Sequence, residues 1–167
     1  MKPIVNIEDL QYVDLAERSR QMGAEMPGRF GGRMAAVGRA IGAKKLGYNV
    51  TVIAPGKRAF PFHSHRLNEE MFFILEGEGE VRIGAETHPV RRGDFIACVT
   101  GGPDKAHQLV NTGKNELKFL AVSTMQQPEV CQYPDSGKMA VFDASEGAAP
   151  LRHVSRESDQ VGYWDGE

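Results

Sequence analysis

Short apolar runs separated by turn residues dominate residues 47–122 and most constrain how this chain folds. One such run extends from Tyr48 to Ala54, and Pro55 and Gly56 close it. Runs of this length, with turns every ~8–12 residues, are typical of an antiparallel sandwich or barrel. The 19 glycines and 9 prolines among 167 residues fit this interpretation, because both residue types interrupt strands and form turns. We therefore expect an all-β fold.

The two ends of the chain differ from this central array. We expect one short amphipathic helix between Asp9 and Met22, followed by a glycine-rich irregular segment. The C-terminal part has strong turn chemistry and one expected edge strand from Met139 to Phe142. These patterns predict one domain with three parts: an N-terminal extension at 1–46 that packs on the barrel or on a partner, a barrel at 47–123, and a C-terminal extension at 124–167.

Charge and hydropathy argue against several classes of protein. Lys and Arg number 20 and Asp and Glu number 22, which is unlike the basic balance of a nucleic-acid-binding protein. No apolar run approaches the ~18–20 residues of a membrane span. The first residues lack the pattern of a signal peptide, and two cysteines are too few for a disulfide framework. We expect a cytoplasmic protein with neither nucleic acid nor a membrane as partner.

The residues that carry chemistry gather around His63 and His65. Alternate residues of a strand face the same side, so both imidazoles are expected to point into one cavity. Glu70 begins the next apolar strand and can lie beside them, and His107, at the start of a later strand, could add a fourth ligand. Imidazoles and a carboxylate on rigid strands are a typical transition-metal ligand set. The alternative is that the two histidines are ordinary polar residues on a solvated face.

These residues resemble the two sequence motifs of the cupins. Gly56, His63, His65, Glu70 and Gly77 follow the order of the first motif, with one extra residue between Gly56 and His63. The resemblance covers about residues 47–123 and implies a small single-domain cupin of the Cupin_2 kind. The fold that it implies is a double-stranded β-helix, or jelly-roll barrel.

The second motif is similar to the run from Gly93 to Asn111. His107 and Asn111 keep the spacing of the family, whereas Val99 stands where a proline is usual and the gap from Gly101 to His107 is longer. The departures therefore fall in the loop 99–106 and leave the ligand positions in place.

What the resemblance implies by position is one metal ion held by four ligands: His63, His65, Glu70 and His107. Zn, Fe, Mn and Ni all remain candidates, because imidazole suits several of them. Dioxygenases, isomerases and decarboxylases occur among cupins, as do non-catalytic modules, and the fold alone does not choose between them. We expect a small polar ligand of the sugar or carboxylate type in the barrel mouth, and a homodimer. The sequence assigns no catalytic residue.

Strand alternation also predicts the lining of the pocket. Phe72, Ile74 and Leu109 are expected on the face of the ligands, although each could equally be plain barrel core. Arg58 flanks the histidine pair and could bind an acidic substrate, a surface position being the alternative. Phe62 is expected to face the opposite way from the two histidines.

Overall fold

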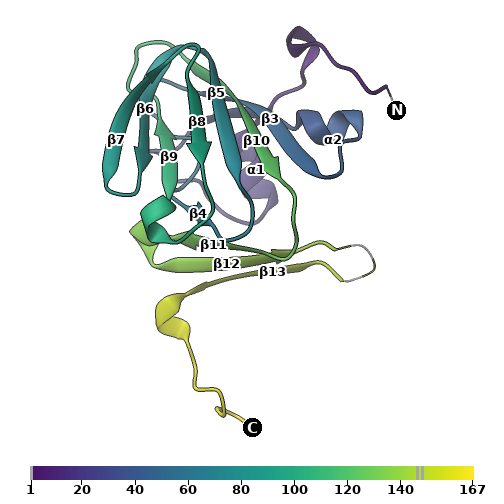
Figure 1. The fold of residues 1–167 in the computed structure, drawn as a ribbon, viewed down its shortest axis with the longest axis vertical. Coiled ribbons are helices and arrows are strands. Elements are labelled where there is room, and N and C mark those ends of the chain that lie inside the picture. Colours follow the sequence, from purple (N-terminus) through teal and green to yellow (C-terminus); the bar gives the residue numbers. More distant parts are fainter. Residues whose placement is uncertain (1, 146, 148) are drawn as a thin grey trace.

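The computed structural model describes residues 2–145, 147 and 149–167, in which strands predominate and helices are short (Figure 1). The strands are β1 Val13–Asp14, β2 Gly32–Ala35, β3 Leu46–Ile53, β4 Ser64–His65, β5 Glu70–Glu76, β6 Glu78–Ile83, β7 Glu86–Arg91, β8 Phe95–Cys98, β9 His107–Val110, β10 Leu117–Thr124, β11 Glu129–Tyr133, β12 Lys138–Asp143 and β13 Leu151–Arg156. The helices are α1 Leu15–Gln21 and α2 Val37–Ile41, with 3-10 turns η1 Ile7–Asp9, η2 Pro103–Lys105, η3 Pro134–Ser136 and η4 Glu157–Asp159. Among the residues described, no helix has the length and apolar character needed to cross a membrane.

Two walls of antiparallel strands form the barrel. The first wall is a six-stranded sheet in the order β1-β2-β3-β10-β5-β8. The second wall joins the sheet β7-β6-β9 to the sheet β13-β12-β11-β4, because a backbone bridge between His63 and His107 links the two. Every pairing between named strands is antiparallel, which confirms the predicted all-β jelly-roll barrel with a short N-terminal helix.

The core lies between the walls and follows the strand period of two. On β10, Leu117, Phe119 and Ala121 are buried, and the residues between them are more exposed. Ile53 of β3 and Ile74 of β5 pack into the same core and have no exposed surface. Burying each large apolar side chain of this kind contributes ~1.5–3 kcal/mol relative to leaving it in water. This packing holds the two walls at a fixed separation.

The N-terminal residues extend the first wall. β2 pairs with β3, and Leu15 of α1 is buried in the core, so this segment packs on the barrel of its own chain. The helix begins later than Asp9, where the sequence analysis started it. Its N-cap is Asp14, whose carboxylate accepts hydrogen bonds from the N–H groups of Ala16 and Glu17.

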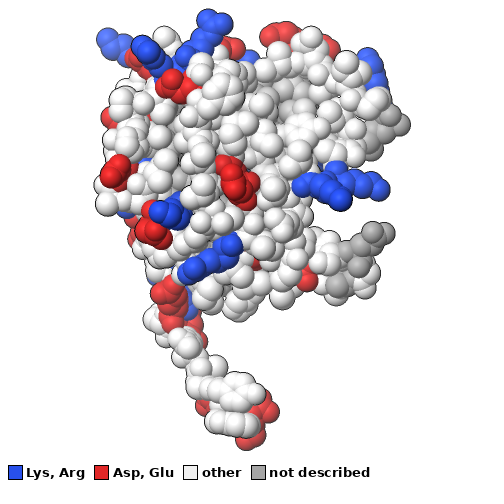
Figure 2. All heavy atoms as spheres, in the orientation of Figure 1, with Lys and Arg blue, Asp and Glu red and all other residues white. Residues whose placement is uncertain are grey.

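The C-terminal residues form a three-stranded layer that continues the second wall. β11 pairs with β4 on one side and with β12 on the other, and β13 pairs with β12. The expected edge strand at Met139–Phe142 corresponds to β12, which lies inside this layer, and β13 forms its edge. The end of the chain stands away from the body, with acidic side chains near its tip (Figures 1 and 2). Tyr163 and Trp164 there are 86% and 78% exposed.

Candidate metal centre

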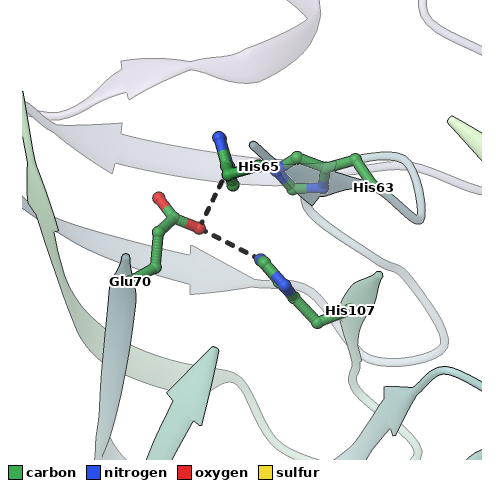
Figure 3. Close-up of side chains that lie close together, drawn as sticks. All are labelled: His63, His65, Glu70 and His107. Atoms are coloured by element: carbon green, nitrogen blue, oxygen red, sulfur yellow. Dashed lines mark hydrogen bonds and ion pairs between the residues drawn. The ribbon is translucent and has the colours of Figure 1, made fainter. Parts of the chain in front are cut away.

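Three histidines and one glutamate converge between the two walls (Figure 3). One ligand atom from each of His63, His65, Glu70 and His107 lies within 4.8 Å of the others. Glu70 begins β5 on the first wall, and His107 begins β9 on the second. His65 lies in β4, and His63 lies just before this strand. All four predicted ligands therefore lie together. The first wall contributes the glutamate, and the second wall contributes the three histidines.

Hydrogen bonds between backbone groups hold the histidines close to one another without a metal ion. His63 and His107 exchange two hydrogen bonds, from His63 N to His107 O at 3.2 Å and from His107 N to His63 O at 2.8 Å. Their ring centroids lie 4.9 Å apart, and those of His63 and His65 are also 4.9 Å apart. His63 and His65 share a face because they are two residues apart in extended chain. The three imidazoles are thus held close by the sheet itself.

The hydrogen bonds of the rings leave one nitrogen of each histidine for the centre. His63 Nδ1 lies 2.8 Å from the carbonyl oxygen of Pro61, and His107 Nδ1 lies 3.4 Å from that of Lys105. An Nδ1–H that donates to a backbone carbonyl leaves the Nε2 lone pair free to bind a metal. This arrangement is the usual one for histidines that hold metals.

The Glu70 carboxylate and the third imidazole complete the donor set. Glu70 Oε2 lies 3.1 Å from His107 Nε2 and 3.5 Å from His65 Nε2. His65 Nε2 is buried, and none of the residues that the structure describes forms a hydrogen bond with it. A buried polar atom without a partner is costly, and a cation at the centre of the cluster would satisfy it. The residues present therefore fit a divalent transition metal.

Burial and neighbouring charges set the protonation states. Burial, followed by the nearby imidazoles of His107 and His65, lowers the pKa of His63 to about 4. Burial alone would raise the pKa of Glu70, but contacts with His107 and His65 outweigh it and hold that pKa well below its usual range. Burial opposes charge on His65 as well, yet the Cys131 sulfur and Glu70 raise its pKa to about 10. Glu70 is thus ionised and His63 neutral near pH 7, the forms that bind metals.

A small cavity adjoins the rings of His63 and His107. Its volume is about 20 Å³, which is room for roughly one water molecule. Phe72 and Leu109 line it, together with Ala59, Phe60, Pro61, Gln108 and Phe119.

Two residues that the sequence analysis placed in the lining lie elsewhere. Ile74 is fully buried in the core between the walls. Arg58 lies beside Gln108, with its Nη1 3.5 Å from Gln108 Oε1. Neither side chain borders the cavity. For Ile74 the reason is that alternation assigns a residue to the inner face of a strand but not to a height along the barrel.

Three residues of β11 reach the centre without having been predicted there. The Tyr133 ring stacks on that of His63, with centroids 6.0 Å apart and 16° between the planes. Cys131 Sγ and Glu129 Oε2 lie 3.4 Å and 3.6 Å from His65 Nδ1. The signal that could have found them is their spacing of two, which puts all three on one face of a strand.

The chain matches known proteins over the same region. Residues 49–123 match the family described as the Cupin domain, Cupin_2. The oxalate-binding protein of Thermotoga maritima is 37% identical over 60 residues, which are 36% of this chain and 47% of that protein. The match thus spans about half the length of that relative.

Two solved structures share the fold. One is described as a sugar phosphate isomerase from a cupin superfamily of Silicibacter pomeroyi; it superposes with a TM-score of 0.76, 24% identity and 98% coverage of both chains. The other is a predicted oxalate decarboxylase of Thermotoga maritima, with a TM-score of 0.59 and 24% identity over 74% of this chain and 99% of that one. The family match identifies residues 49–123 of the barrel as a cupin domain of the Cupin_2 kind, and the two solved structures share the fold of the chain.

Proposed function

We propose that this protein holds one divalent transition metal and uses it to bind a small polar molecule in the barrel mouth. The ligands are His63, His65, Glu70 and His107, and the convergence of their donor atoms within 4.8 Å carries the proposal. Zn, Fe, Mn and Ni all accept such a set of imidazoles and a carboxylate. When bound, the metal supplies a Lewis acid that polarises an oxygen of the ligand.

The charge of the proposed centre favours an anionic oxygen ligand. A metal displaces any proton from the imidazole nitrogens that it binds, so three neutral rings and the Glu70 carboxylate would leave a divalent ion with one net positive charge. Phe72, Leu109 and Phe119 surround the cavity with apolar groups, which lowers the local dielectric and strengthens attraction for an anion. Carboxylates and phosphorylated sugars both present such oxygens. The oxalate-binding protein of Thermotoga maritima and the sugar phosphate isomerase of Silicibacter pomeroyi are named for molecules of these two classes.

A non-catalytic binding module is the second candidate. Apart from His63 and His107, the side chains that line the described cavity include no acid or base, and Gln108 is their other polar member. Dioxygenase, isomerase and decarboxylase reactions each need proton transfer or metal redox chemistry beside the substrate. Turnover of a bound ligand would favour an enzyme, and metal-dependent binding without product would favour the module.

Elemental analysis of the purified protein tests the metal site. We expect the wild type to bind about one transition metal per chain, and His63→Ala and Glu70→Gln to lose it. His88→Ala is the matched control, because His88 lies exposed on β7, away from the centre. A wild type that takes up none of the four metals, even after incubation with each, contradicts the proposal.

Calorimetry with metal-loaded and chelated protein tests the ligand class. Oxalate and a sugar phosphate are the probes, and we expect binding of at least one of them only when the metal is present. Equal binding after chelation would show that the metal does not hold the ligand.

We also propose that the protein is a cytoplasmic homodimer. Both cysteines are free thiols, as a reducing compartment would keep them. Leu151 and Val154 are exposed on the edge strand β13, and Tyr163 and Trp164 are exposed beyond it. An open antiparallel edge with apolar side chains is a surface on which a second copy can pair. Light scattering that finds only an 18.3 kDa monomer would contradict the dimer.

A further inference from the structure

We propose that β11 positions the metal ligand His65 through two side chains, Glu129 and Cys131. Glu129 ties down the loop that joins His65 to Glu70, and Cys131 orients the His65 ring. Both residues lie beyond residues 49–123, the region that matches the family. The inference rests on the proposed metal site and adds to it a support that comes from the C-terminal layer.

Glu129 binds three consecutive backbone groups of this loop. Its Oε1 accepts hydrogen bonds from the N–H groups of Arg66 at 3.1 Å and Leu67 at 3.2 Å, and its Oε2 accepts one from Asn68 at 2.8 Å. The carboxylate also accepts from the Asn68 side-chain amide and from the N–H of Val130. Glu129 is only 5% exposed, so water competes little for these bonds.

Asn68 anchors the loop from the other side. Its Oδ1 accepts hydrogen bonds from Gln126 N at 2.7 Å and from Thr124 Oγ1 at 2.9 Å, and its Nδ2 donates to Gln126 O at 3.0 Å. The loop therefore has little freedom. Because it joins His65 directly to Glu70, fixing the loop also fixes the separation of these two ligands.

The donors around Glu129 argue that it is not itself a metal ligand. Glu129, His65 and Cys131 do place donor atoms within 4.8 Å of one another. The Glu129 carboxylate already accepts five N–H groups, however, and a carboxylate has about four lone-pair sites. Binding a metal there would strip hydrogen bonds from N–H groups that are buried or partly buried, at a cost of up to ~1–3 kcal/mol for a buried group left unpaired. Glu129 therefore acts through the loop.

Cys131 faces the nitrogen of His65 that points away from the centre. β11 pairs with β4 so that Cys131 lies directly opposite His65. Cys131 Sγ is 3.4 Å from His65 Nδ1, within reach of a hydrogen bond to sulfur. An Nδ1–H that donates to Sγ would leave Nε2, which lies on the side of Glu70, as the nitrogen that binds a metal once its own proton is displaced. The sulfur takes the place that the carbonyls of Pro61 and Lys105 take for the other two rings.

The test compares metal affinity, ligand geometry and stability in four variants of the full chain. Glu129→Gln replaces an acceptor by an amide, Glu129→Asp keeps the charge, and Cys131→Ala removes the sulfur. Glu116→Gln is the matched control, because Glu116 is an exposed carboxylate far from the centre. The readouts are the Zn²⁺ dissociation constant, from competition with a chromogenic chelator, and the visible spectrum of the Co²⁺ form.

We expect Glu129→Gln and Cys131→Ala each to weaken Zn²⁺ binding about 10–100-fold and to shift the Co²⁺ bands. Glu129→Asp should recover part of the affinity, and Glu116→Gln should match the wild type in Zn²⁺ affinity and Co²⁺ spectrum. A Glu129→Gln protein with wild-type affinity and spectrum but a lower unfolding midpoint would overturn the inference, because that is the signature of a purely structural role.

Two further results have to be told apart from a purely structural role of Glu129: a Glu129→Gln protein that does not fold, and a wild type that binds no metal. If Glu129→Gln does not fold, Cys131→Ala decides, since it leaves the loop bonds in place; wild-type affinity and Co²⁺ bands in that variant overturn the inference. If the wild type itself binds neither Zn²⁺ nor Co²⁺, the proposed function fails together with the inference built on it. Only this last result is visible without any variant.

Discussion

Glu70 Oε2 and His107 Nε2 lie 3.1 Å apart, although the two residues belong to opposite walls of the barrel. The centre therefore exists only when the walls have closed on their core. Phe72 links the centre to the core. Its ring packs edge-on against the His107 ring, with centroids 5.6 Å apart, and against the core ring of Phe119, with centroids 5.3 Å apart. Changes in folding stability and in metal binding should be coupled through this contact.

Metal binding is expected to stabilise the fold. A ligand that binds only the folded state adds RT ln(1 + [L]/Kd), or about 2.7 kcal/mol at a hundredfold excess over Kd. Thermal unfolding with Zn²⁺ and with EDTA should show a higher midpoint with the metal. Glu70→Gln should lose this difference and His88→Ala should keep it. A shift of equal size in Glu70→Gln would place the bound ion elsewhere.

Asn111→Ala should lower the free energy of unfolding by about 2–4 kcal/mol. Asn111 is completely buried, and its Nδ2 donates to the carbonyls of Ile53 and Asn115, both at 2.8 Å. Its Oδ1 accepts from the N–H of Gly113 at 3.0 Å. Removal of the amide leaves buried backbone groups unpaired, at ~1–3 kcal/mol each. Urea unfolding measures the change, and Asn115→Ala is the control, because Asn115 contributes only its backbone; equal losses in both variants would contradict the explanation.

Gly77→Ala should be more destabilising than Gly93→Ala. Both glycines have positive φ, 83° and 95°, so alanine is strained at either position by ~1–2 kcal/mol. A Cβ at Gly77 would also lie 2.3 Å from the carbonyl oxygen of Glu116, whereas no atom of the described part of the chain lies within 4 Å of one at Gly93. The difference between the two urea midpoints isolates the clash. Equal urea midpoints would mean that the strained backbone conformation alone accounts for the loss of stability in both variants.

The ion pair between Arg33 and Glu116 should stabilise the protein at neutral pH and less in acid. Arg33 Nη1 lies 2.5 Å from Glu116 Oε1, and this hydrogen bond holds the pKa of Glu116 below its usual value against a smaller opposing effect of burial. A lowered pKa contributes stability above the unfolded value, ~4.3, and loses it as the pH falls through the folded value. Both side chains are about half exposed, so the contribution is under ~1 kcal/mol.

Urea unfolding of the wild type and Glu116→Gln at pH 7 and pH 3 measures this contribution. The gap in free energy between the two proteins should narrow at pH 3 and should also narrow in high salt. A gap that widens on acidification would assign the stabilisation to a group other than this carboxylate.

Local spacing accounts for part of the centre. His63 and His65 share a face because side chains alternate along extended chain, and that could be predicted from two residues. That Glu70 and His107 could join them follows from their places at strand starts and from the resemblance between motifs, but no local rule decides which strands on opposite walls meet. Phe62 shows the limit of alternation. It does not line the cavity beside the histidine rings, yet it is only 3% exposed, and the Arg82 guanidinium lies 3.6 Å from the centre of its ring.

The amino-acid sequence by itself determined the alternation of strands and turns, the all-β class and the shared face of His63 and His65, because each of these depends on residues within a few positions of one another. Only the tertiary structure decided which strands meet. The pairing of β11 with β4 brings Cys131 opposite His65 and places Glu129 under the loop after it. These contacts join residues more than 60 positions apart. Such pairings follow from the closure of the whole barrel, in which the burial of one face selects each strand's neighbour.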